Sequence, residues 1–493
     1  MSFFIGIDCG TQGTKVIIYD AVKRQIVSSG SARHKLISQN DGLREQEPRW
    51  WIIALDIAMK KALASFYENK KLISAIGVSG QQHGLVVLDK ERTVLYNAKL
   101  WNDTSTALEN DILVEQAGGI SGVIKKIGTA IPVGYTASKL IWLKRYKPQI
   151  FSQIAYVMNP KDFINFYLTG VICTDFGSAS GTGFFNVLKK EWSQQMLDVI
   201  DPSGVLTAAL PTLFSEDAPI GYIRPEIAKK YGLSKTCKVS IGSGDNMAAA
   251  IGTGCIKNGV GTITLGTSGV LSIFTDKTPV RYPSIVQIQN LLSKSWIPTI
   301  CTMNATSTTT CVQSLFGLDI ETFDRKLKKT TPGANGVSIF PFFNGERMPP
   351  LPCAKGIIAG LACSNFTQDN IIRASAEAVA FCLKWGYSLL KKKGINLYQM
   401  SIVGGGSNSM PWQQIISDVF NVELVSPANK EAGALGAAIL AMNICKEEEL
   451  STLCDIHIRF TKQKIKPKKE HVFLYEDIYN DYIESRNFFY KLK

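Results

Sequence analysis

Two aspartates in glycine-rich surroundings, Asp8 and Asp245, are the residues whose type and position could do chemistry. The β-branched start and glycines of residues 241–244, followed by the alanine-rich residues 247–251, predict a strand, a tight turn and a helix whose N-cap is Asp245. The carboxylate would then lie in a loop whose glycines let other groups approach closely. Taken alone, the stretch favours an ordinary helix cap over a catalytic acid.

Asp8 ends a β-type run, residues 3–7, and a Gly/Thr-rich turn leads to a second run, residues 15–19. This pattern predicts a hairpin. Backbone N–H groups of such a turn, together with the hydroxyls of Thr11 and Thr14, can surround phosphates, and Asp8 could hold a hydrated Mg²⁺. A glycine-rich hairpin alone is weak support for a nucleotide site.

A second stretch repeats the first. Residues 263–276 align with residues 7–20 without a gap, which places Gly266-Thr267-Ser268-Gly269 on the first turn and Thr264 on Asp8. Two halves that each begin with a phosphate-binding hairpin could face one nucleotide, and only the first could bring a carboxylate to a metal. A chance match between two glycine turns is the alternative. The chain contains neither a P-loop nor a strand-linked G-x-G-x-x-G motif.

Further polar groups follow short predicted strands. Gln82 and His83 come directly after residues 76–80, and Trp101, Asn102 and Asp103 end the next strand. This combination suits a sugar, because rings stack on its C–H face and its hydroxyls need paired hydrogen bonds. A polar turn packed on its neighbours is the simpler interpretation of His83.

Residues 402–408 predict a strand that ends in three glycines. A flat ring could lie against Gly405 and Gly406, with Asn408 at its edge. A turn leading into the helix predicted at 412–420 explains the same glycines equally well. The other helices that must hold these segments include residues 47–63, which begin with an acidic cap and a first-turn proline, and residues 371–390.

Length and composition suit two large domains. The chain has 493 residues, 45% of them hydrophobic, and no apolar run approaches the roughly 20 residues of a membrane span. Together with the lack of a basic leader, this favours a cytoplasmic protein without a membrane partner. Eleven cysteines with no C-x-x-C pair suggest neither a disulfide framework nor a zinc site.

The net charge is +13, and the densest basic segment is residues 462–469. A polyanion partner would bind there, but the remaining excess is diffuse lysine. We therefore expect a solvated surface with some steering of phosphorylated ligands and no nucleic-acid partner.

The order of the motifs resembles the FGGY family of carbohydrate kinases over nearly the whole chain. The motifs that carry this resemblance are Gly6-Ile-Asp-x-Gly-Thr11, Gln81-Gln-His-Gly84, Trp101-Asn-Asp103, Gly244-Asp-Asn246, Gly266-Thr-Ser-Gly269, Gly404-Gly-Gly-Ser407 and Glu431-Ala-Gly-Ala-Leu-Gly436. The resemblance implies an α/β fold with two ribonuclease-H-like domains of the actin/hexokinase type flanking a central cleft. The expected domains are residues 1–252 and 253–493.

The resemblance also implies ATP and Mg²⁺, with Asp245 as catalytic base and Asp8 as a carboxylate that holds the metal through water. It predicts sugar contacts from Gln82, His83, Trp101, Asn102, Asp103 and Asp245, and ATP contacts from Thr11, Gln12, Lys15, Gly266, Thr267, Gln313, Gly405, Gly406 and Asn408. An aspartate at a helix N-terminus should have a depressed pKa. A weak base suffices nevertheless, because phosphoryl transfer has a loose transition state.

The expected acceptor is the C5 hydroxyl of D-xylulose, in an enzyme that could form a homodimer. Two departures weaken this choice of sugar. Gln82 stands where xylulose-specific members commonly have Met, and Thr104-Ser-Thr106 replaces a segment containing Arg. Kinases for ribulose, gluconate or glycerol are the nearest alternatives. A chaperone-like or actin-like ATPase would share the fold, and a nucleic-acid binder rests on charge alone.

Overall fold

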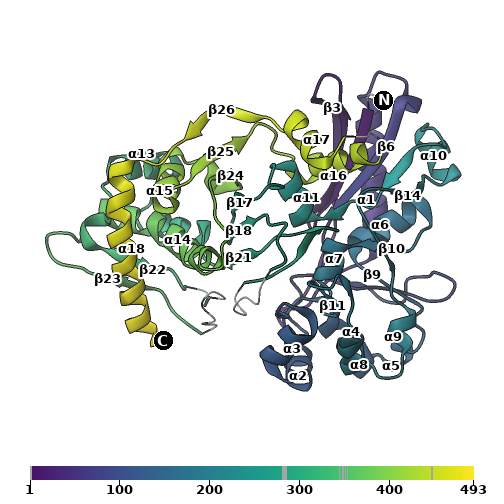
Figure 1. The fold of residues 1–493 in the computed structure, drawn as a ribbon, viewed down its shortest axis with the longest axis horizontal. Coiled ribbons are helices and arrows are strands. Elements are labelled where there is room, and N and C mark those ends of the chain that lie inside the picture. Colours follow the sequence, from purple (N-terminus) through teal and green to yellow (C-terminus); the bar gives the residue numbers. More distant parts are fainter. Residues whose placement is uncertain are drawn as a thin grey trace.

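Two lobes, each built on a mixed β-sheet, make up the protein in a computed structural model (Figure 1). The structure describes residues 3–279, 286–343, 345, 346, 349, 351, 353–445 and 448–492. The first lobe holds a seven-stranded sheet and the second a six-stranded sheet, and helices cover both. The expected α/β class with two sheet-containing domains is confirmed.

The first sheet has the strand order β14-β15-β6-β1-β2-β3, with β16 beside β6. The predicted hairpin is present as antiparallel β1 and β2, and β6 runs parallel to β1. The bounds are β1 (Phe3–Cys9), β2 (Gly13–Asp20), β3 (Gln25–Arg33), β6 (Ile73–Gly80), β14 (Pro219–Tyr222), β15 (Lys238–Ser240) and β16 (Ser243–Gly244).

Helices pack against both faces of this sheet, which explains why β1 is apolar almost throughout. α1 (Pro48–Ala64) contacts β2 and β3, and α16 (Ala432–Asn443) contacts β1 and β6. α16 lies directly on the sheet backbone, because a Cβ atom on Gly6 would lie 1.9 Å from the carbonyl oxygen of Ala434. α1 begins as predicted, with Glu47 at the N-cap and Pro48 in the first turn.

The second sheet has the strand order β21-β18-β17-β24-β25-β26. It repeats the first, because β17 and β18 form an antiparallel hairpin and β24 runs parallel to β17. The bounds are β17 (Val260–Leu265), β18 (Gly269–Ile273), β21 (Thr299–Thr302), β24 (Gln399–Val403), β25 (Glu423–Pro427) and β26 (Phe460–Ile465). The basic segment 462–469 forms the end of this edge strand and the start of the last helix.

The gap-free alignment of the two hairpins is wrong beyond their turns. Asp8 pairs with Lys15 in the first hairpin, whereas Thr264 pairs with Val270 in the second, so the second turn is one residue shorter. Gly10 N–H accordingly donates to the Gly13 carbonyl, three residues later in the chain. Gly266 N–H donates to the Ser268 carbonyl, two residues later. A shift of one residue reverses the face to which each side chain points. The structural counterpart of Lys15 is therefore Val270.

The lobes are joined through two helices in which small residues allow close packing. α11 (Asp245–Gly252) packs against α16, and a Cβ atom on Gly436 would lie 1.9 Å from the Ala248 carbonyl oxygen. One buried apolar cluster unites Phe4 of the first sheet with Met247, Val260 and Leu440. α16 thus comes from the second half of the chain and packs on the sheet of the first (Figure 1).

The remaining helices enlarge each lobe. Those of the first lobe are α2 (Ala107–Gln116), α3 (Gly119–Ile127), α4 (Thr136–Tyr146), α5 (Pro148–Phe151), α6 (Pro160–Thr169), α7 (Phe176–Ser180), α8 (Gln194–Ile200), α9 (Val205–Ala208) and α10 (Pro225–Tyr231). The second half adds α12 (Thr306–Leu315), α13 (Ile320–Lys329), α14 (Gln368–Lys391), α15 (Met410–Phe420), α17 (Leu450–His457) and α18 (Lys469–Tyr490).

All eleven cysteines are free thiols, and six of them are buried. Across the described ranges, no helix combines the length and apolar character needed to cross a bilayer.

Candidate active site

Three strand ends of the first sheet bring Asp8, Gln82 and Asp245 to one edge. β1 and β16 both run parallel to β6, with Asp8 opposite Ser79 and Gly244 opposite Gly80. The carboxyl ends of parallel strands meet at the same sheet edge, where α/β proteins commonly bind ligands. The two aspartates singled out from the sequence therefore lie at the same edge of the sheet.

Asp8 is held at the end of β1. Its Oδ1 accepts a hydrogen bond of 2.8 Å from the Ser79 hydroxyl. Burial raises the pKa of the Asp8 carboxyl, and the charge of Glu431 raises it further, while Ser79 and Lys15 act in the opposite direction. A Cβ atom on Gly433 would lie 2.8 Å from Asp8 Oδ2, so the start of α16 lies over this carboxylate.

Asp245 is the first residue of α11, and the predicted N-cap is wrong by one residue because Gly244 occupies that position. The Asp245 carboxylate accepts a hydrogen bond of 2.8 Å from the adjacent Asn246 N–H. Its pKa is raised to about 7 by burial and by the charge of Asp8, so the expected depression is also wrong. Loss of water and a nearby like charge outweigh the end of an eight-residue helix. A carboxyl that titrates near neutrality suits proton transfer.

Lys15 and Glu431 form an ion pair that links β2 to the start of α16. The Lys15 ammonium donates to both carboxylate oxygens of Glu431 at 2.7 Å. Both side chains are partly exposed. Glu431 belongs to a motif recognised in the sequence but was not predicted as a site residue. Its 416-residue separation from Lys15 leaves no local signal for the pairing.

Gln82 and His83 present one neutral amide and one neutral imidazole. His83 has a left-handed backbone with φ +66°, and its Nδ1–H donates to the Gly181 carbonyl at 3.0 Å. Its Nε2 therefore accepts from the Gln82 amide, at 3.1 Å. The ring stacks on Tyr135, and burial lowers the pKa of His83 to about 4.

The Gln82 amide oxygen is buried without a hydrogen-bond partner among the described residues. A Cβ atom on Gly244 would lie 1.8 Å from it, so this oxygen lies beside the residue that precedes Asp245. The Asn102 amide oxygen is likewise buried and unpartnered within that part of the chain. Buried acceptors of this kind normally have partners. Both oxygens are thus available to ligand hydroxyls.

Trp101 and Asp103 have different roles in the structure. The Trp101 side chain is 47% exposed and its Nε1–H donates to the Thr11 hydroxyl at 2.9 Å, which ties this loop to the first hairpin turn. Asp103 is fully buried, and its carboxylate accepts from Arg44 N–H, the Lys99 ammonium and Ser105. The predicted sugar contact of Asp103 therefore needs correction, because protein groups already occupy its acceptors.

Lys139 supports the His83 turn from beneath, a role that the sequence did not reveal. Its fully buried ammonium donates to the carbonyl oxygens of His83 at 3.1 Å and Tyr135 at 3.0 Å, and to that of Gly134. Burial lowers the pKa of Lys139 to about 7. The burial of this charge depends on packing between α4 and the turn at His83, which are distant in sequence.

The two hairpin turns are supported in different ways. In the first, the Gln46 amide donates to the Thr11 carbonyl at 2.9 Å, and Gln12 remains exposed. In the second, Thr267 is exposed and its carbonyl accepts from Ala305 N–H at 3.0 Å, next to the start of α12. α12 also carries Gln313, which is partly buried.

The glycine turn after β24 lies beside the second hairpin. A Cβ atom on Gly404 would lie 2.5 Å from the Leu265 carbonyl oxygen, and its φ of +91° also requires glycine. A side chain on Gly406 would meet Leu265, whereas Gly405 faces open space. Asn408 is exposed and its amide donates to the Gly405 carbonyl at 3.1 Å. The expected adenosine residues and the second turn therefore share one edge.

The carboxylates of the first edge fit Mg²⁺ in part. Asp8 and Glu431 supply hard oxygen donors. Among the described residues, no group of three or more acidic, histidine or cysteine side chains could enclose a metal. A metal held mainly by phosphate oxygens and water, with one protein carboxylate nearby, matches this donor set.

Comparison with known proteins identifies the family. The model of the N-terminal domain of FGGY carbohydrate kinases matches residues 3–252, and that of the C-terminal domain matches residues 261–444. The chain is 44% identical over 485 residues to xylulose kinase of Haemophilus influenzae, which covers 97% of this chain and 98% of that protein.

Two solved structures from Lactobacillus acidophilus are similarly close. Its xylulose kinase has a TM-score of 0.90 at 25% identity, covering 99% of this chain and 98% of the other. Its gluconate kinase has the same TM-score and identity, covering 98% and 97%. The overall fold is therefore shared by kinases of different sugars, and the expected actin/hexokinase-like architecture is confirmed. The chain is an ATP-dependent sugar kinase that belongs to the FGGY family of carbohydrate kinases.

Proposed function

We propose that this kinase transfers the γ-phosphoryl group of ATP to the C5 hydroxyl of D-xylulose, with Asp245 as the base. The observation that carries the reaction is the position of Asp245, next to an unpartnered amide oxygen of Gln82 and at the same sheet edge as Asp8. The choice of sugar is supported by the full-length similarity to the Haemophilus influenzae xylulose kinase.

Positioning and charge neutralisation dominate the mechanism, because the transition state of phosphoryl transfer is loose. The Asp245 carboxylate accepts a hydrogen bond from the C5 hydroxyl and takes its proton as the new O–P bond forms. Its neighbour Asn246 donates an N–H to the same carboxylate, which fixes the direction of the other oxygen. His83 stays neutral and positions the Gln82 amide.

Asp8 and the hairpins hold the phosphoryl donor. When bound, Mg²⁺ supplies positive charge to the transferring phosphates, and Asp8 would hold it through water with Glu431 nearby. Thr11, Gln12 and Lys15 of the first hairpin and Gly266 and Thr267 of the second contact the phosphates in this proposal. Gly405, Gly406, Asn408 and Gln313 surround the adenosine. Closure of the lobes excludes water from the cleft.

The unpartnered groups at the proposed sugar site favour a neutral polyhydroxy compound as the phosphoryl acceptor. The amide oxygens of Gln82 and Asn102 are acceptors and suit hydroxyl donors. A carboxylate such as that of gluconate would need donors in their place. This observation supports a polyhydroxy acceptor such as D-xylulose.

A sugar panel tests the proposal. ADP release is measured with D-xylulose, D-ribulose, D-gluconate, glycerol and no sugar, at one ATP and Mg²⁺ concentration. We expect the highest kcat/KM with D-xylulose and negligible ADP release without sugar. A different preferred sugar would reject the substrate, and hydrolysis unaffected by any sugar would instead support an ATPase. We also propose a cytoplasmic location, which the eleven free thiols support.

A further inference from the structure

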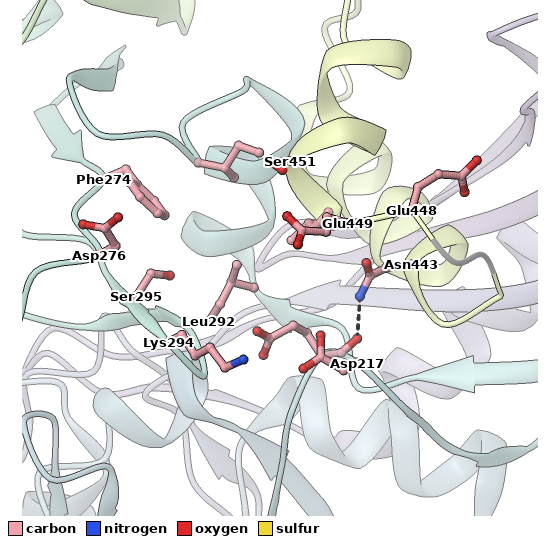
Figure 2. A pocket seen from close by; sticks show the side chains of 13 residues that line it. Asp217, Phe274, Asp276, Leu292, Lys294, Ser295, Asn443, Glu448, Glu449 and Ser451 are labelled. Atoms are coloured by element: carbon pink, nitrogen blue, oxygen red, sulfur yellow. Dashed lines mark hydrogen bonds between the residues drawn. The ribbon is translucent and has the colours of Figure 1, made fainter.

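A pocket of about 470 Å³ lies at the junction of the lobes, and Figure 2 shows the side chains that line it. It lies beyond the end of the β17–β18 hairpin opposite the turn at residues 266–268, because Phe274 and Asp276 follow β18 and line it. The other described lining residues are Glu216, Asp217, Ile256, Leu292, Lys294, Ser295, Asn443, Glu448, Glu449, Leu450 and Ser451. Its volume is in the range of small-molecule sites.

Segments from both halves of the chain form the walls, and hydrogen bonds join three of them. The Glu216 carboxylate accepts from Ser293 N–H at 3.0 Å and from the Ser293 hydroxyl at 2.9 Å. The Glu216 carbonyl accepts from the Asn443 amide at 2.9 Å, and Figure 2 marks this bond by a dashed line from Asn443. These bonds link the loop before β14, the turn between β19 (Asn290–Leu292) and β20 (Ser295–Trp296), and the end of α16. These bonds therefore connect three of the wall segments across the junction.

The pocket is strongly acidic. Five carboxylates and one ammonium, that of Lys294, occur among its described lining residues, although the chain as a whole carries a net charge of +13. A concave site lined by one sign of charge concentrates ions of the opposite sign. The bound ligand should accordingly be a cation.

A buried hydroxyl gives an independent indication of a ligand. Ser295 is 4% exposed, and its Oγ has no hydrogen-bond partner among the described residues. Figure 2 shows this oxygen directed toward the interior of the pocket. An unpartnered buried hydroxyl costs free energy. A ligand that donates a hydrogen bond to Ser295 would remove this cost.

The arrangement of the carboxylates decides between a metal and an organic cation. Within the described chain, no three acidic, histidine or cysteine side chains lie close enough together to hold a metal ion. Apolar side chains, among them Phe274, Leu292 and Leu450, line the same pocket as the acids. Spaced ammonium groups on an aliphatic chain would match this mixed lining, because methylenes pack on apolar surface while the charges pair with carboxylates.

We propose that this pocket binds a small linear aliphatic polyamine through Asp276 and Glu449, with Ser295 accepting a hydrogen bond from an ammonium group. Because its walls come from both lobes, binding should also stabilise the lobe junction. This site is independent of the phosphoryl-transfer reaction proposed above.

Calorimetric titration of the full-length protein with spermidine at constant ionic strength tests the proposal. We expect one saturable site, and at least tenfold weaker binding in the double variant Asp276→Asn/Glu449→Gln. The control variant Glu68→Gln/Glu91→Gln removes the same two charges from exposed positions of the first lobe and should bind like the wild type. Ser295→Ala should bind spermidine several-fold more weakly. Unchanged kcat of the pocket variants in the absence of spermidine confirms that they are folded.

Two results would overturn the assignment. These are no saturable binding of spermidine, and equal weakening of spermidine binding in the pocket and control variants. The second would indicate diffuse attraction to surface charge. Neither of these results depends on which sugar the enzyme phosphorylates.

Discussion

The two hairpins of this kinase have the same topology but different chemistry. In the first, Asp8 pairs with Lys15 across the strands, and Glu431 lies within reach of both. The corresponding pair in the second is Thr264 and Val270, neither of which carries a charge. The Thr11 hydroxyl of the first turn accepts from Trp101 of the loop at residues 101–103, here called the sugar loop. The Thr267 carbonyl of the second turn accepts from the backbone N–H of Ala305, next to the start of α12. The two hairpins thus share one topology, but only the first carries charged side chains at these paired positions.

This difference indicates a division of labour. The neutral hairpin needs only its backbone N–H groups and one hydroxyl to contact phosphates. The charged hairpin can also place a metal and communicate with the sugar loop through Trp101. Substitutions at corresponding positions should therefore have unequal effects.

The largest expected difference is between Asp8 and its counterpart. Asp8→Asn should lower kcat about 10³-fold, because the charge that places the metal is removed. Thr264→Asn, which introduces the same side chain at the corresponding position, should change kcat less than threefold. Steady-state kinetics at saturating ATP and sugar compare the two. Similar losses in both variants would show that the hairpins are functionally equivalent.

Asp103 tests the anchoring of the sugar loop beside the first hairpin. Asp103→Ala leaves Lys99 buried with one fewer partner and should reduce the free energy of unfolding by about 3 kcal/mol. The KM for sugar should change less than threefold if the fold is retained. Asp111→Ala, at an exposed position on the neighbouring helix, is the control and should stay within about 0.5 kcal/mol of wild type. Urea denaturation measures both, and a large change in sugar KM with normal stability would restore Asp103 as a sugar contact.

Asp245 should reduce stability in the ligand-free enzyme. Its folded-state pKa of about 7 exceeds the ordinary 3.8, so the ionised carboxylate reduces the free energy of unfolding above pH 7. Protonation of the folded protein restores this free energy as the pH falls toward 4. Asp245→Asn should therefore be more stable than wild type by about 2 kcal/mol at pH 8, a partial value because the carboxyl is partly exposed. The advantage should disappear by about pH 4. Denaturation in EDTA at both pH values measures it, and equal stability at pH 8 would contradict the raised pKa.

The smallest effects should come from the two turn threonines. Thr11→Ala removes the acceptor for Trp101 and should raise the KM for both sugar and ATP several-fold. Thr267→Ala should raise only the KM for ATP, because its turn has no such link to the sugar loop. Two-substrate kinetics separate the effects. A sugar KM that changes equally in both variants would remove the proposed link between the first turn and the sugar loop.

Local patterns predicted the elements that position the site, but they did not predict its long-range contacts. Apolar β-type runs and glycine turns were enough to place both hairpins, and the Glu47-Pro48 start was enough to place α1. The two aspartates were predicted in separate elements, and the parallel pairing of β1 and β16 with β6 brings them to one edge. The one-residue difference between the turns was missed because glycine-rich segments align equally well with or without a gap.

The remaining errors concern burial and distant partners. The raised pKa of Asp245 depends on burial and on the charge of Asp8, which is remote in sequence. The pairing of Lys15 with Glu431 and the burial of Lys139 likewise follow from packing between segments. Asp103 was assigned to sugar because its residue type suited hydroxyls, whereas its partners Arg44 and Lys99 became apparent only in the fold.

The central claim is that Asp245 acts as the base on a sugar hydroxyl held beside it. The most direct measurement is the turnover of Asp245→Asn with D-xylulose and ATP, together with calorimetric binding of D-xylulose to the same variant. We expect kcat to fall about 10³-fold while the Kd for D-xylulose changes less than about fivefold. Turnover within tenfold of wild type, with sugar binding intact, would contradict the claim.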